Sequence, residues 1–148
     1  MSLPGYTVNS DQGNFLSINR DTAKVILGNN RFENYQYSNS TGSEVTLECG
    51  TVMGRVASSG DVIPLVSTAT DGSQYPIGIL TTKHVVADGT SLTVSICIGG
   101  NVNQNLLVFS GSDDLDTVIE DRRLADRITG DTYGINLIAS TQLSKFDN

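Results

Sequence analysis

The sequence has no tryptophan, one histidine and two cysteines among its 148 residues. It contains no CxxC pair, so the common zinc-binding pattern is missing. Nine basic residues face sixteen acidic ones, which gives a formal net charge of -7. Because phosphate contacts need clustered Lys and Arg, this balance argues against a nucleic acid or an anionic membrane as a partner. The arginines at 120–127 alternate with acids, as on a solvated surface.

Long apolar runs are also missing from the sequence. None approaches the roughly 18 residues of a membrane span, and residues 1–13 lack the charged and apolar regions of a signal peptide. We therefore expect the protein to be made and used in a cytoplasm-like compartment. Cys49 and Cys97 both lie in apolar, strand-like runs, so a pair of buried thiols is favoured over a disulfide.

Residues 44–148 have the pattern of short strands joined by turns. Val45, Leu47 and Cys49 alternate, and Gly50 marks a bulge or bend before the pattern resumes. Pro64 lies inside an apolar run, which predicts an edge strand or the start of a strand. Further strands are expected at 75–86, 91–100, 103–111 and 133–140.

One late helix is predicted after these strands. Ser112 or Asp113 can act as its N-cap, and the acids that follow suit the positive end of the helix dipole. The apolar stripe shifts after Arg122, so the helix is either broken there or buries two faces. Gly130 can terminate it. The chain as a whole therefore predicts one mainly β domain, β-rich α+β in class, with a single late helix.

Residues 1–43 differ in composition from the rest. They are rich in Asn, Ser and Gly, which favour turns and bury too little apolar surface to offset the entropy of ordering. The segment is either an ordered meander or an arm that becomes ordered on a partner, and we favour the arm. Its aromatic side chains are Tyr6, Phe15, Phe32, Tyr35 and Tyr37.

His84 is the one candidate for nucleophilic catalysis. Residues 80–89 invite comparison with the histidine loop of a trypsin-like protease, which needs a serine beside the imidazole and an acid to orient it. The closest downstream string, 109–116, lacks the glycines that bring backbone donors around such a nucleophile. A surface or strand-end histidine explains His84 better.

Metal and phosphate sites are not predicted either. The acids at 113–121 lack the central glycine of a calcium-binding loop, and acids at the start of a helix explain them more simply. The glycines at 50, 54 and 60 do not form a phosphate-binding pattern. The sequence thus predicts no catalytic, cofactor-binding or metal-binding residue.

Residues 49–80 carry a resemblance to a known family. A G-x-V-[LM]-G strand is followed, after a variable turn, by A-x-D-G-x-x-x-P-x-G-I-L. In this order and spacing the sequence resembles the head decoration protein D family of lambda-like tailed phages, over about residues 44–140. It departs from shorter members in its long N-terminal segment and at 81–110. The matching positions are Gly50, Val52, Met53, Gly54, Ala69, Asp71, Gly72, Pro76, Gly78, Ile79 and Leu80.

These motif residues are expected to have structural roles. Asp71 and Gly72 would make a turn and Pro76 would stiffen the entry to the next strand. Gly78 would allow a close backbone approach, while Ile79 and Leu80 fill the core.

The resemblance implies a non-enzymatic cement protein, without a cofactor, on the outside of an expanded phage head. Its compact sandwich-like or barrel-like domain would be residues 44–148, with three copies around local three-fold axes. Residues 1–43 would be an arm that adds as a strand to the major capsid protein. The partners would be that protein and further copies of this chain, and the protein would be made in the host cytoplasm. The expected capsid-contacting residues of the arm are Tyr6, Val8, Phe15, Leu16 and Ile18.

Two alternatives remain from the sequence. A fibre or spike component would have a similar composition of strands and turns. A small hydrolase would use His84.

Overall fold

The structure, a computed structural model, describes residue 22 and residues 24–139. It is strand-rich, with 46% of the described residues in strands and 11% helical. The prediction of a mainly β fold with one late helix is confirmed.

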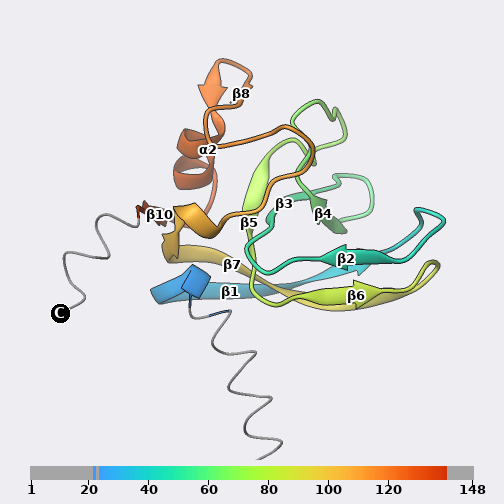
Figure 1. Cartoon of the computed structure of the whole chain (residues 1–148). Helices are drawn as coiled ribbons and strands as arrows, with labels where there is room; N and C mark the ends of the chain where they lie inside the picture. The colour runs from blue at the N-terminus through green and yellow to red at the C-terminus, as the bar shows by residue number, and fades with distance from the viewer. Residues whose placement is uncertain (1–21, 23, 140–148) are drawn as a thin grey trace, which may run out of the picture.

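A six-stranded sheet forms the centre of the molecule (Figure 1). Its order is β1-β7-β5-β3-β4, and β10 also pairs with β7. Two smaller ribbons, β2 with β6 and β8 with β9, lie outside it. The strands are β1 (Ile26–Ser38), β2 (Val45–Leu47), β3 (Val52–Arg55), β4 (Val62–Pro64), β5 (Pro76–Leu80), β6 (His84–Val86), β7 (Ser91–Asn103), β8 (Val118–Ile119), β9 (Arg122–Arg123) and β10 (Ile135–Ile138).

Strand β7 organises this sheet. It pairs with β1 along its length in antiparallel fashion, from Ser38 opposite Ser91 to Ile26 opposite Val102. On its other side it pairs with β5 at residues 96 and 97, and in parallel with β10 from Gly100 onward. Three segments that are distant in the sequence therefore meet on this one strand.

The core lies on both faces of the sheet. Val94, Ile96 and Ile98 are buried in one cluster, together with Leu47 and Val86 of the β2–β6 ribbon. The predicted alternation of this strand is thus confirmed. The intervening Cys97 lies in the second cluster, with residues of helix α2 (Leu124–Gly130) and with Ile135. Because successive strand residues point to opposite faces, the β2–β6 ribbon covers one face and α2 covers the other.

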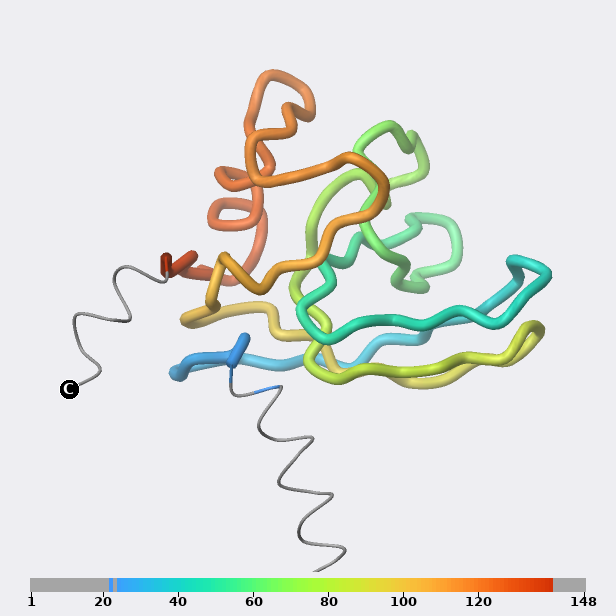
Figure 2. The backbone as a smooth tube through the Cα atoms, in the orientation of Figure 1, coloured from blue at the N-terminus to red at the C-terminus, as the bar shows by residue number. Residues whose placement is uncertain are grey.

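The segment after β7 also covers the second face. It begins with a 3-10 turn, η2 (Gln104–Leu106), and then passes across the sheet before it reaches α2 (Figure 2). The Val108 N–H donates to the Gly50 carbonyl at 2.9 Å, and the Val108 carbonyl accepts from Val52 N–H at 3.0 Å. This segment therefore extends the sheet edge locally and packs Leu107 and Phe109 on the core.

Two predictions about glycine and proline positions are confirmed, one of a bend and one of an edge strand. Gly50 has φ +93° at the bend between β2 and β3, a conformation that side chains rarely adopt. Pro64 ends β4, which is the outer strand beside β3. Proline suits this place because an edge strand leaves some of its N–H groups unpaired.

The extent of the late helix was predicted wrongly. Helix α2 begins at Leu124, so neither Ser112 nor Asp113 is its N-cap. Asp113 instead accepts hydrogen bonds from the Ser67 amide and hydroxyl, at 3.0 and 2.6 Å. Glu120 and Asp121 have φ of 49° and 66°, which closes the β8–β9 hairpin where a helix was expected. Acids favour such turns as well as helix starts, because their short side chains accept nearby N–H groups.

The N-terminal boundary also needs correction. Residues 26–38, assigned to the arm from the sequence, form β1 in the main sheet. Tyr37 is only 4% exposed and belongs to the core. The alternation of Tyr35 and Tyr37 is a strand pattern, which the polar residues around them obscured. The five predicted capsid-contacting arm residues lie outside the described residues, and they stay a prediction.

Candidate interaction surface

The motif residues of β3 and β5 come together as one buried block. Strands β3 and β5 are neighbours, with Val52 opposite Ile79 and Met53 opposite Gly78. Val52, Ile79 and Leu80 are at most 1% exposed. A side chain on Gly78 would collide with the Cys97 carbonyl, so the predicted close approach is present. These contacts pack β3 and β5 against each other in the core of the sheet.

The turn before β5 is fixed by side-chain hydrogen bonds. Asp71 accepts from the hydroxyl and the amide of the buried Ser73, and these bonds hold the pKa of Asp71 below its usual range. The Ala57 N–H donates to the Asp71 carbonyl at 2.8 Å, which ties the turn to the segment after β3. Pro76 then opens β5 and is buried.

His84 is the first residue of β6, opposite Leu47. Burial lowers its pKa, and its Nε2 atom is buried without a hydrogen-bond partner in the described part of the chain. A serine nucleophile would need to donate to that atom or to its ring partner. The geometry around His84 is that of a half-buried strand-end side chain.

The two cysteines are present as thiols. Burial raises the pKa of Cys97, whose Sγ accepts from Asn30 Nδ2 at 3.3 Å. A raised pKa disfavours the reactive thiolate. Cys49 donates to the Thr81 carbonyl at 3.1 Å.

The described residues offer neither a metal site nor a membrane-spanning helix. Among residues 22 and 24–139, no group of His, Cys, Asp and Glu side chains could hold a metal ion. Within the same range, no helix combines the length and the apolar character that crossing a membrane requires.

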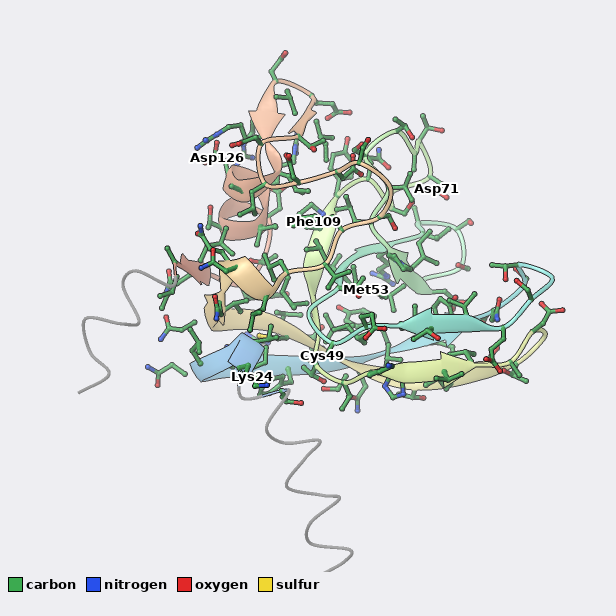
Figure 3. The ribbon with its side chains drawn as sticks, in the orientation of Figure 1. Lys24, Cys49, Met53, Asp71, Phe109 and Asp126 are labelled. Carbon is green, nitrogen blue, oxygen red and sulfur yellow. The ribbon has the colours of Figure 1, made fainter. Side chains whose placement is uncertain are left out.

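The entry of the chain into the domain is well anchored. Thr22 Oγ1 donates to the Thr81 carbonyl at 2.8 Å, and Val25 is buried in the core. A cavity of about 210 Å³ lies beside this entry, lined by Lys24, Val25, Glu48, Cys49, Lys83 and Leu106. Lys24 is labelled near the start of β1 in Figure 3. The N-terminal segment therefore joins the domain at residues that the core and the Thr81 carbonyl hold in place.

Open strand edges and exposed apolar side chains are the features that suit binding. In the described part, β1 pairs on one side only, with β7. Its thirteen residues make it a long edge, and such edges can accept another strand. The large apolar side chains exposed to solvent are Phe32, Val66, Val85, Leu106, Val108, Val118 and Tyr133.

Comparison with known proteins identifies a family for this chain. No curated protein matches the sequence. A family model, described as Bacteriophage lambda head decoration protein D, matches residues 26–125. The match begins at the first residue of β1, so this strand belongs to the family domain. The chain belongs to the bacteriophage lambda head decoration protein D family, a family of structural proteins of the phage capsid.

Proposed function

We propose that this chain is a cement protein, which binds the outside of the expanded phage head and bridges neighbouring capsid subunits. The family match over residues 26–125 is the observation that carries this proposal. The buried motif block, the thiol cysteines and His84, whose Nε2 atom has no partner, supply no arrangement for catalysis among the described residues. The protein acts by binding alone.

The segment before β1 is the arm in this proposal. Residues 1–21 could span about 70 Å if fully extended. An extended segment that adds to a sheet edge of the major capsid protein gains main-chain hydrogen bonds along its length. The anchoring of Thr22 and Val25 would transmit that attachment to the folded domain. Tyr6, Val8, Phe15, Leu16 and Ile18 supply the side-chain contacts of the arm.

Three copies around each local three-fold axis would make the attachment strong. Each copy contributes one arm, and the binding of a second arm becomes intramolecular once the first has bound. Weak individual contacts then add to a stable attachment, which suits a protein of the virion exterior. The net charge of -7 would also keep the protein away from packaged or free DNA.

Binding to expanded heads that lack a decoration protein tests the proposal. We expect saturable binding of the purified full chain, measured by co-sedimentation with the heads, and little binding to unexpanded heads. The absence of saturable binding would contradict the function. Deletion of residues 2–21 should abolish attachment and leave the thermal unfolding of the domain nearly unchanged. Undiminished attachment of this variant would remove the arm from the mechanism.

A further inference from the structure

The outer half of the β1–β7 pair has one face on the core and one bare face. Tyr37 and Val94 are buried in one core cluster, and Tyr35 packs against it. The residues between them point the other way, because side chains alternate along a strand and directly opposite residues share a face. We call this second surface the bare face. Its exposed side chains are Phe32, Asn34, Gln36 and Ser38 of β1 and Ser91 and Thr93 of β7.

Cross-strand contacts show that these side chains share one surface. Ser91 Oγ donates to Ser38 Oγ at 2.9 Å, and Thr93 Oγ1 donates to Gln36 Oε1 at 3.4 Å. Phe32 lies at the inner end of the bare face, and its side chain is 49% exposed. The bare face is therefore a continuous strip with an aromatic ring at one end and hydroxyl and amide groups along the rest.

The bare face carries no charged side chain. No Asp, Glu, Lys or Arg occurs from 34 to 43 or from 89 to 112. Arg31 and Glu33, which flank Phe32 in the sequence, point to the opposite face. Covering the bare face therefore removes no ion from water, which lowers the cost of binding. Its hydroxyl and amide groups both donate and accept hydrogen bonds, so they suit a polar partner.

Asn39 holds the end of the β1–β7 pair in place. This residue is 2% exposed, and its side-chain amide donates to the Ser43 carbonyl at 2.8 Å and to the Val86 carbonyl at 2.9 Å. The Asn39 N–H donates to the Thr90 carbonyl at 2.9 Å. One residue thus ties the turn after β1 to the turn before β7. A surface that is already ordered loses less entropy on binding, so the bare face is pre-organised.

The bare face adjoins the point where the chain enters the domain. Thr22 is bonded to the Thr81 carbonyl. The Thr81 N–H and hydroxyl both donate to the Ser95 carbonyl, at 3.2 and 2.9 Å. Ser95 is opposite Asn34 of the bare face. These short links connect the entry point with the bare face, so a partner that holds residues 1–21 is held beside it.

We propose that the bare face is a second contact of the folded domain with the major capsid protein, next to the contact that the arm makes. This inference rests on the proposed function and names a further part of the same binding site. The arm supplies the first attachment and brings the bare face onto the shell. Phe32 then buries its ring against the capsid protein, and Asn34 and Gln36 form hydrogen bonds with its surface, as aromatic and amide side chains do in other interfaces.

The first test compares two double variants of the full chain on expanded heads that lack a decoration protein. Phe32→Ala/Gln36→Lys removes the ring and places a charge within the bare face, and it should bind about 30-fold more weakly than the unchanged protein. Val85→Ala/Thr46→Lys is the matched control, because these two exposed residues lie opposite each other on the outer side of the β2–β6 ribbon. This control should stay within about twofold of the unchanged protein. Thermal unfolding checks that both variants fold.

A second test locates the contact with a single exposed substitution. On heads that carry few copies, the thiol of Gln36→Cys should react with a maleimide about tenfold more slowly than in the free protein, because an interface excludes solvent. The thiol of Thr46→Cys should react at the same rate in both states. The unchanged chain gives the background reaction of Cys49 and Cys97.

The outcomes separate this contact from the proposed function. Equal binding of the unchanged protein and Phe32→Ala/Gln36→Lys, or equal reactivity of Gln36→Cys on and off the heads, would overturn the second contact and leave the proposed function standing. No binding of the unchanged protein would overturn both. Protection of position 36 only on fully covered heads would assign the bare face to a neighbouring copy of this chain. Protection in the free protein that is lost when residues 2–21 are deleted would assign it to the chain's own arm. Both assignments contradict the proposal.

Discussion

The motif block at 50–80 and the acidic region at 112–131 show two different ways of fixing a backbone. In the motif block, buried residues and close backbone contacts hold β3 against β5, and side-chain hydrogen bonds fix only the turn at Asp71 that leads into β5. In the acidic region, side chains hold the chain: Asp113 binds Ser67, and Arg127 binds the carbonyls of Ile119 and Glu120. Arg127 is the main link, because its guanidinium is buried and also meets Asp131 and the Tyr75 ring.

The comparison explains which local sequence signals are reliable. A glycine required by a close contact has few alternatives, so its position in a pattern is informative. An acid that accepts a nearby N–H group serves equally well at a turn or at a helix start. The sequence of the acidic region therefore predicted one helix. The structure has a hairpin there, followed by a short helix.

The largest effect is expected inside the motif block. Gly78→Ala places a methyl group against the Cys97 carbonyl and about 2.6 Å from Ile96 Cγ2. We expect a loss of about 3 kcal/mol in the free energy of unfolding, measured by urea denaturation. Gly89→Ala is the control, since φ is +74° there and no atom lies within 4 Å. Gly89→Ala should lose only about 1 kcal/mol in the free energy of unfolding. Equal losses in the two variants would contradict the role of close backbone contacts in the motif block.

The acidic region should depend on its buried arginine. Arg127→Met leaves the Ile119 carbonyl without its 2.8 Å hydrogen bond and should destabilise the protein by roughly 2 kcal/mol. Arg122→Met removes an exposed pairing with Asp131 and should cost less than about 1 kcal/mol. Thermal unfolding of both variants gives the comparison. Similar small losses of stability in both variants would show that the hydrogen bonds of Arg127 do not hold this region.

The hairpin and the predicted helix can be distinguished by the sign of one substitution. Asp121 has φ +66°, so Asp121→Gly relieves backbone strain and should stabilise the protein by up to about 1 kcal/mol. In a helix interior the same change would destabilise it by a similar amount. Chemical denaturation measures the sign. A clear loss of stability would favour the helix.

The smallest effect is expected from the half-buried histidine beyond the motif block. Burial lowers the pKa of His84 in the folded protein. The unfolded chain therefore binds a proton first, and stability falls as the pH drops below about 6.5. His84→Gln should remove this part of the pH dependence, as thermal unfolding between pH 5 and 8 would show. An unchanged pH profile would mean that burial does not shift the pKa of His84.

Much of the sheet could be predicted because its signals are local. The alternation of Val94, Ile96 and Ile98, the proline at 64 and the glycine at 78 each specify a strand or a contact by themselves. Strand β1 could not be recognised in the same way, because polar residues surround the alternation of Tyr35 and Tyr37. Arg31 and Tyr133 are brought together only by the pairings of β7, so no local pattern could reveal their contact.

The dependence of β1 on β7 has a consequence during synthesis. The ribosome adds 53 residues between Ser38 and its partner Ser91, which takes about 3 to 10 s at ordinary elongation rates. Until Ser91 and the residues after it have been made, the β1 segment, with the aromatic rings of Phe32, Tyr35 and Tyr37, has no pairing partner. Slow, non-local pairing of this kind leaves a chain open to association with its neighbours. The polar residues between those rings limit the apolar surface that an unpaired β1 can present to neighbouring chains.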